Sequence, residues 1–271
     1  MVNNLGIFWF RQDLRLQNNE ALHRLIKKCD KILPIFIDDK NVELGGASKW
    51  WLHHSLESLD KSLKKKNSKL YLFRGEPIKI LYKLIKEYKI ESVYWNRLYD
   101  SYSINRDINL KKILSENDVE TISFKGSLIN EPWSIKNKSN TFFKVFTPYW
   151  NACLEEKKTI ILNDSVNKIS TIKINSPESL CIDELKLYPK KSKWTKTLSL
   201  NWIPGEKQAL KNLEYFKKNI LNDYENGRDR PDKNITSKLS PHLHFGEISP
   251  EKIFIEIQNE KIINDKIKKN F

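Results

Sequence analysis

The chain has 271 residues, of which 39% are hydrophobic and 30% are charged, and its formal net charge is +14. This length allows one large domain or two smaller ones with a buried core. No apolar stretch approaches the ~20 residues that a membrane-spanning helix needs, so we expect a soluble, cytoplasmic protein with no membrane partner.

The first 125 residues alternate between segments typical of strands and segments typical of helices. Short apolar runs rich in β-forming residues predict strands at Leu5–Phe10, Lys31–Ile37, Lys69–Phe73, Ser92–Trp95 and Glu120–Phe124. Helical periodicity predicts helices at Glu20–Cys29, Ser48–Lys65, Pro77–Tyr88 and Ser103–Asn117. We expect Ser48 to cap its helix and Pro77 to occupy the first turn of the next. This alternation indicates βαβ units and a parallel sheet with helices on both faces.

The predicted fold class is therefore α/β, with a Rossmann-like five-stranded parallel sheet domain over residues 1–156. The eight glycines form neither GxGxxG nor GxxxxGK[ST], so we do not expect a glycine loop to hold a dinucleotide after the first strand. That loop instead carries Arg11, Asp13 and Arg15. If the chain stays extended, these three lie on one side, where they could pair with each other and fix a domain interface.

The pattern changes after the sheet domain. Residues 157–200 are rich in Lys, Ser, Asn and Thr without a sustained period, which predicts an interdomain linker that crosses the surface. Residues 201–271 predict the beginning of an all-α domain. Apolar residues recur at helical spacing in Glu206–Tyr224, and Ser249 followed by Pro250 and Glu251 predicts a capped helix start.

Three motifs occur in order along this layout. Their sequences are FWFRQDLRL at residues 8–16, FKVFTPYW at residues 143–150, and TSKLSPHLHFGEISP at residues 236–250, the last preceded by Tyr224 and Arg228. Together they resemble the DNA photolyase and cryptochrome family, and the likeness covers essentially the whole chain. The resemblance implies that residues 201–271 open a helical FAD-binding domain. It also implies light-dependent repair of cyclobutane pyrimidine dimers in DNA, the reaction of a deoxyribodipyrimidine photo-lyase, with damaged DNA as the partner.

The resemblance implies a flavin site in the third motif. It assigns FAD contacts, chiefly to the diphosphate, to Tyr224, Thr236, Ser237, Lys238, Leu239 and Ser240. Hydroxyl groups beside the free N–H groups of a helix N-terminus suit a diphosphate, although on the residues alone an ordinary Ser/Thr helix cap explains them too. The family usually has Arg where this chain has Lys238, and Lys lacks the planar fork of Arg.

The resemblance also places Arg228 at the rim that faces DNA. Thirteen basic and six acidic residues lie between Lys186 and Lys238, which fits a surface that follows phosphates. A solvated charged face explains the lysines equally well. Forty of the 48 basic residues are Lys, so a biased composition contributes to the net charge.

Neither the cysteines nor the histidines predict a metal site. Cys29, Cys153 and Cys181 are odd in number and form no CxxC pair, so we expect reduced thiols. His242 and His244 form an HxH pair without further ligands at fitting spacing, so we expect them to pack in a core or interface.

An antenna chromophore stays unassigned. Family members that bind methenyltetrahydrofolate tend to have Asn-Glu shortly after a Tyr-acid pair, and others use a deazaflavin. Here Tyr99-Asp100 is followed by Tyr102-Ser103, so that pattern is broken.

In the family, further helices complete the flavin pocket, contact the lesion and carry the tryptophans that reduce the flavin. The chain ends at Phe271, before that region, so we assign no catalytic residue. We expect the chain by itself to bind FAD weakly or not at all and to be inactive, unless a second polypeptide supplies the rest. A cryptochrome-like blue-light photoreceptor and a non-catalytic DNA-binding remnant are the alternatives, and the lesion type is left open.

Overall fold

The computed structural model describes residues 4–156, 160–163, 166–189 and 192–260. Five parallel strands form one sheet in the order β3-β2-β1-β4-β5. The strands are β1 (Leu5–Phe10), β2 (Lys31–Asp39), β3 (Tyr71–Gly75), β4 (Ser92–Asn96) and β5 (Glu120–Phe124). This sheet confirms the predicted fold class.

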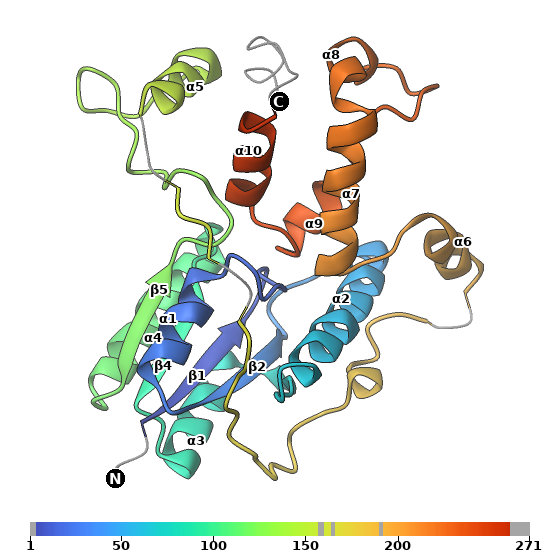
Figure 1. Ribbon diagram of the computed structural model, residues 1–271. Coiled ribbons are helices and arrows are strands. Elements are labelled where there is room, and N and C mark those ends of the chain that lie inside the picture. The colour runs from blue at the N-terminus through green and yellow to red at the C-terminus, as the bar shows by residue number, and fades with distance from the viewer. Residues whose placement is uncertain (1–3, 157–159, 164–165, 190–191, 261–271) are drawn as a thin grey trace.

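Helices cover both faces of the sheet (Figure 1). They are α1 (Glu20–Lys28), α2 (Gly46–Lys64), α3 (Pro77–Tyr88) and α4 (Ser101–Ser115). Successive side chains of a strand point to opposite faces, so Phe8 and Phe10 share a core with α1 and α2, while Ile7 and Trp9 share another with α3 and α4. All four of these side chains are almost completely buried.

Local capping explains where these helices begin. Asn19 accepts a hydrogen bond from Leu22 N at the start of α1, and Asp100 accepts one from Ser103 N, so α4 begins before the predicted Ser103. Pro77 lies in the first turn of α3, as predicted. The prediction that Ser48 caps its helix is wrong. Gly45 is the N-cap of α2, and the good helix former Ala47 already lies inside the helix.

The second half of the described chain is mainly helical. It contains α5 (Phe146–Glu155), the 3₁₀ helix η1 (Ile182–Leu185), α6 (Lys193–Asn201), α7 (Glu206–Asn219), the 3₁₀ helix η2 (Leu221–Asp223), α8 (Tyr224–Gly227), α9 (Ser240–His244) and α10 (Pro250–Gln258). Figure 1 shows α7, α9 and α10 beyond one end of the sheet. They share a third core that includes Phe216, Leu239 and Ile257.

Two helix predictions in this half have different outcomes. Ser249 caps α10 as expected, because its hydroxyl accepts a hydrogen bond from Lys252 N at 3.0 Å. The helical spacing noted in Glu206–Tyr224 corresponds to α7, which ends at Asn219 and is followed by η2 and α8. Of the predicted helical portion, residues 261–271 lie outside the described residues. In the ranges given above, no helix combines the length and apolar character needed to cross a membrane.

The predicted linker packs closely against the sheet domain. Residues 157–159, 164–165 and 190–191 lie outside the described residues. In the remainder, Ile32 exchanges backbone hydrogen bonds with Ser170 and Ile172, and Leu180 N donates to Leu72 O. Ile169 and Leu185 are each 1% exposed. The linker therefore contributes to the core, and α6 gives its end a helical turn that the irregular pattern did not predict. The domain boundaries themselves stay predictions.

Candidate functional site

The loop after β1 joins the sheet domain to the helices beyond it. The Arg15 guanidinium donates to Gly246 O at 3.0 Å and to Gly126 O at 2.8 Å. Leu14 N donates to Phe245 O at 3.1 Å. These contacts confirm that Arg15 fixes an interface between parts of the chain far apart in sequence.

Arg11 and Asp13 act differently from the prediction. The Arg11 guanidinium makes two hydrogen bonds, at 2.8 and 2.9 Å, with the Asp107 carboxylate on α4. Asp13 accepts from the Arg11 backbone N–H at 2.6 Å and from the Asn96 amide at 2.6 Å. Burial lowers the pKa of Arg11, and the negative charge of Asp107 opposes that shift. The expected pairing of these side chains with each other is therefore wrong, because α4 and β4 provide closer partners.

A buried acid, Glu247, connects the same two regions. Its carboxyl group accepts hydrogen bonds from Trp51 Nε1 at 3.1 Å and from Gly205 N at 2.7 Å. It also contacts the Ser55 hydroxyl and His242 Nδ1. Glu247 is 0% exposed, so these donors replace the water that a carboxyl group needs. Trp51 and Ser55 lie on α2, and the acid therefore holds α2 against the loop between α9 and α10.

The structure places the two histidines of the HxH pair in different surroundings. His242 is fully buried, and its Nε2 lies 3.2 Å from the Asn212 side-chain amide on α7. His244 is exposed. The packing role expected of the pair is confirmed for His242.

The hydroxyl-bearing turn precedes α9, which begins at Ser240. Leu239 is 2% exposed and anchors the turn in the third core, whereas Thr236, Lys238 and Ser240 are exposed. Lys238 has a left-handed backbone with φ of 54°, which reverses the chain. Leu239 N donates to the Ser237 hydroxyl at 3.4 Å. The sequence thus folds into a sharp turn that exposes hydroxyl and cationic groups above a buried leucine.

Three of the six predicted FAD contacts line one cavity. Thr236, Ser237 and Lys238 border a space of about 220 Å³, together with Asn212 and Tyr215 of α7. In the described part of the chain, the lining of this space does not include Leu239, Ser240 or Tyr224. A cavity with hydroxyl, amide and ammonium groups can hold an anion, because each group offers a hydrogen-bond donor.

Tyr224 begins α8, and Arg228 lies next to it at the end of that helix. The Tyr224 ring packs against Phe216 with 5.3 Å between ring centres. The Arg228 guanidinium lies 5.7 Å from the centre of the Tyr224 ring, and its side chain is 48% exposed. Arg228 thus rests on an aromatic ring at the surface, where its Nε also lies 3.5 Å from the exposed carboxylate of Asp229.

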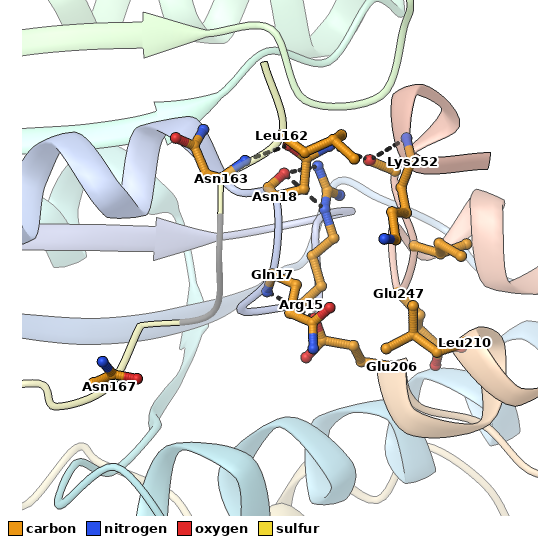
Figure 2. A pocket seen from close by; sticks show the side chains of 12 residues that line it. Arg15, Gln17, Asn18, Leu162, Asn163, Asn167, Glu206, Leu210, Glu247 and Lys252 are labelled. Carbon is orange, nitrogen blue, oxygen red and sulfur yellow. Dashed lines mark hydrogen bonds between the residues drawn. The ribbon is translucent and has the colours of Figure 1, made fainter. Parts of the chain in front are cut away.

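A second, polar cavity lies between the loop after β1, the linker and α7 (Figure 2). It has a volume of about 450 Å³, and Arg15, Glu206 and Lys252 are among its lining residues. The Glu206 carboxylate accepts hydrogen bonds from Gln17 N at 2.7 Å and from Leu16 N at 3.1 Å. Sequence analysis missed both Glu206 and Glu247. Apart from His242, their partners lie far away in the sequence. The signal that could have found them is an acid that directly follows a glycine with a positive φ, at Gly205 and Gly246.

The stretch considered for an antenna is occupied by structural contacts. Asp100 caps α4, and Tyr102 donates to Asp39 Oδ2 at 2.8 Å. Tyr99 donates to Glu131 Oε2 at 2.9 Å, and burial together with that acid raises the pKa of Tyr99 to about 12. These contacts explain the residue choice there without a chromophore.

Comparison with known proteins identifies the family. Residues 6–168, which contain the loop after β1 and the sheet apart from Leu5, match the family model described as DNA photolyase. The chain belongs to the DNA photolyase family. It is 40% identical over 249 residues to a deoxyribodipyrimidine photo-lyase of Agrobacterium fabrum, across 92% of this chain and 52% of the relative. It is 31% identical over 259 residues to Cryptochrome-1 of Arabidopsis thaliana, across 92% of this chain and 37% of the relative.

Solved structures of the family show the same fold. A bacterial class III photolyase from Agrobacterium tumefaciens superimposes with a TM-score of 0.95 at 37% identity, over 100% of this chain and 56% of the other. An archaeal photolyase from Sulfolobus tokodaii, described with two FAD molecules, gives a TM-score of 0.74 at 26% identity over 97% of this chain and 56% of the other. The chain spans about half the length of these photolyases.

Proposed function

We propose that this chain is part of a flavoprotein that repairs cyclobutane pyrimidine dimers in DNA with light. The observation that supports this most strongly is the turn at residues 236–240, which exposes hydroxyl groups to a cavity within a photolyase-family fold. The sheet domain lacks a glycine loop, so a dinucleotide cofactor would have to bind elsewhere in the fold. The helices beyond the sheet provide that place.

FAD, when bound, supplies the electron that splits the dimer, and the chain binds and orients it. In the proposed site, the hydroxyl groups of Thr236, Ser237 and Ser240 donate hydrogen bonds to the diphosphate. Lys238 adds a positive charge, and Leu239 holds the turn in place from below. Tyr224 lies beside the Phe216 ring, where it would contact the cofactor from α8.

Damaged DNA is the proposed partner, with Arg228 at its phosphates. The dimer would have to leave the base stack to reach a flavin, and cations at the rim would hold the distorted backbone. The exposed guanidinium of Arg228 on the Tyr224 ring suits that role, because the ring limits its conformational freedom.

A second polypeptide with further helices is a proposed partner as well. Apolar side chains of α5 and α10 border a cavity of about 170 Å³, and these include Trp150, Phe254 and Ile257. Phe146 on α5 is 72% exposed. Such surfaces are usually covered by protein. Which antenna chromophore accompanies FAD stays unassigned.

A cryptochrome-like photoreceptor is the second candidate function, favoured by the 31% identity with Cryptochrome-1 of Arabidopsis thaliana. A remnant that only binds DNA is the third candidate, and the surplus of lysines supports it. The repair function predicts that light removes dimers from DNA, whereas the photoreceptor and the remnant predict that light leaves the dimers in place.

The test is a repair assay on a chimaera. This chain would be joined to the part of the Agrobacterium tumefaciens photolyase that it does not match, so that the helical domain is whole. We expect the purified chimaera to retain FAD and to remove dimers from irradiated DNA under blue light but not in the dark. Retention of FAD without repair would favour the photoreceptor, and salt-sensitive DNA binding without FAD would favour the remnant.

A further inference from the structure

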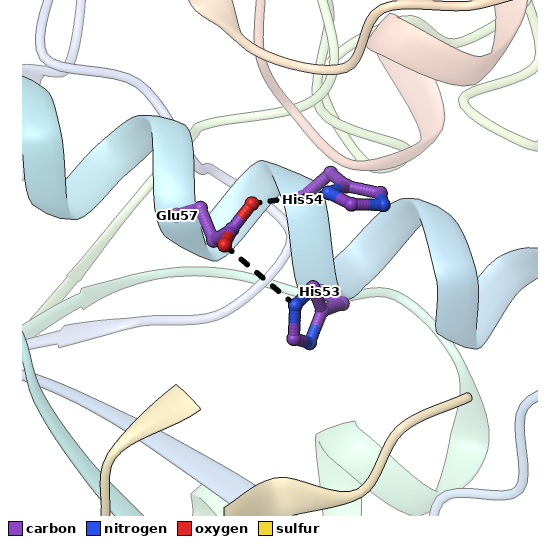
Figure 3. Close-up of side chains that lie close together, drawn as sticks. All are labelled: His53, His54 and Glu57. Carbon is purple, nitrogen blue, oxygen red and sulfur yellow. Dashed lines mark hydrogen bonds and ion pairs between the residues drawn. The ribbon is translucent and has the colours of Figure 1, made fainter. Parts of the chain in front are cut away.

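Two histidines and a glutamate gather on α2 (Figure 3). His53, His54 and Glu57 occupy adjacent turns of one helix, where residues three and four apart lie on the same side. Their ligand atoms all lie within 4.8 Å of one another. The Glu57 carboxylate lies between the two imidazoles, with one oxygen directed to each.

The distances suit a small divalent cation. His54 Nδ1 lies 3.0 Å from Glu57 Oε2, and His53 Nε2 lies 3.8 Å from Glu57 Oε1. Zinc binds imidazole nitrogen and carboxylate oxygen at about 2.0–2.2 Å, so neighbouring ligands of a tetrahedral site lie about 3.3 Å apart. The observed separations lie on either side of that value. The two imidazole nitrogens lie within 4.8 Å of each other, so closing the set onto one ion requires His54 and Glu57 to rotate towards His53.

One of the three side chains is buried and packed, and the other two border a cavity. The His53 side chain is 4% exposed and its ring packs against Tyr188 at 4.9 Å, which limits its rotation. His54 and Glu57 border an open cavity of about 430 Å³. The cavity gives an ion and water access to His54 and Glu57, and its lining also includes Lys61, Lys65 and Lys207.

The linker contributes a further acid beside the same histidine. Asp183 of η1 has its Oδ1 3.9 Å from His53 Nε2, and its side chain is 64% exposed. Carboxylates near an imidazole favour a cation at that nitrogen. An ion on α2 would therefore draw the linker towards the helix.

We propose that α2 binds a zinc-type divalent cation through His53 Nε2, His54 Nδ1 and the Glu57 carboxylate. Two imidazoles and one carboxylate form a donor set that prefers zinc over magnesium or calcium, which take mainly oxygen ligands. The prediction of no metal site was based on the cysteines and on the HxH pair at residues 242–244. It did not consider the HHxxE pattern at residues 53–57. The proposal concerns a separate site and does not depend on the proposed repair function.

The test is direct titration of the 271-residue chain, freed of metal by chelation and of any affinity tag. Calorimetry with ZnCl₂ should show one ion bound per chain, and Co²⁺ should give the visible absorption of a four-coordinate site. We expect Glu57→Gln and His54→Gln each to weaken binding at least about tenfold. Mg²⁺ at the same concentration should give no signal.

The matched control is the pair Glu20→Gln and His23→Gln on α1, which removes the same groups at helical spacing where no third ligand of this kind gathers among the described residues. These variants should bind zinc as the unchanged chain does. Binding that is absent from the unchanged chain, or that falls equally in the control variants, would overturn the proposal. Circular dichroism of each variant establishes that its helix content is kept.

Discussion

The Glu247 carboxyl group is the most densely hydrogen-bonded acid at the junction between α2 and the later helices. Trp51, Gly205 and Ser55 all donate to it in a site closed to water. We expect Glu247→Ala to lower the free energy of unfolding by about 3 kcal/mol, because it leaves these donors unsatisfied. Glu43→Ala, at an exposed position, should change it by less than about 0.5 kcal/mol. Urea denaturation measures both, and equal effects would contradict the assigned role.

Glu206 should give the junction a pH dependence. Burial raises its pKa, and the hydrogen bonds from Gln17 and Leu16 only partly oppose this shift. The folded chain therefore holds the proton to a higher pH than the unfolded chain, whose glutamate has a pKa of 4.5. This contribution to stability is complete below that pH and is lost as the pH rises through the folded pKa.

We accordingly expect the thermal midpoint of the unchanged chain to fall relative to that of Glu206→Gln as the pH rises from 4.5 towards neutrality. Differential scanning calorimetry across that range gives the comparison. If the thermal midpoints of the two proteins changed in parallel with pH, Glu206 would have the same pKa in the folded and the unfolded chain.

Arg228 and Arg230 offer a matched pair of surface arginines. Arg230 makes two hydrogen bonds with Asp232, at 2.9 and 2.8 Å, whereas Arg228 rests on the Tyr224 ring with a longer ion pair of 3.5 Å to Asp229. If Arg228 contacts a phosphate, Arg228→Ala should weaken binding to irradiated duplex DNA severalfold and reduce the salt slope by about one. Arg230→Ala should change the slope less. Fluorescence anisotropy at several salt concentrations tests this, and identical slopes would remove Arg228 from the interface.

At the scale of elements, the loop after β1 meets the turn between α9 and α10 at Gly246. Its φ of 63° is left-handed, and a Cβ there would lie 2.1 Å from Gln12 O. The contact is with backbone, which cannot move aside without breaking the Leu14–Phe245 hydrogen bond. A side chain would therefore push two elements apart.

We expect Gly246→Ala to destabilise the chain by about 3 kcal/mol. Gly45→Ala is the control, since its Cβ would meet nothing within 4 Å and its φ is negative, so it should cost only about 0.5–1 kcal/mol through the weaker helix N-cap. Chemical denaturation of both variants provides the measurement. A mild effect at Gly246 would mean that the two elements are not rigidly joined.

At the scale of the whole molecule, the sequence predicted what depends on local pattern. The bounds of β1 and β5 agree with the prediction, and the starts of α3 and α10 follow from Pro77 and from the Ser249 cap. It could not predict Glu247, whose partner Trp51 lies 196 residues away, or the pairing of Arg11 with Asp107. These contacts depend on how segments that are distant in the sequence pack together, and the hydrophobic periodicity of a single sequence gives no information about them.

The proposed cofactor site also combines a part that the sequence predicts with a part that it does not. The motif located the turn, and the structure adds the cavity beside it, the anchor at Leu239 and the position of Tyr224 against Phe216. The packed linker was missed because its buried residues, such as Ile169 and Leu185, follow no regular spacing.

The most direct test of the account is an equilibrium titration of FAD with the chimaera and with its Thr236→Ala, Ser237→Ala, Ser240→Ala variant, followed by flavin fluorescence. If these hydroxyl groups hold the diphosphate, the variant should bind FAD at least about tenfold more weakly, because it loses several hydrogen bonds to a charged group. An unchanged affinity in a variant that keeps its helix content would contradict the proposed flavin site.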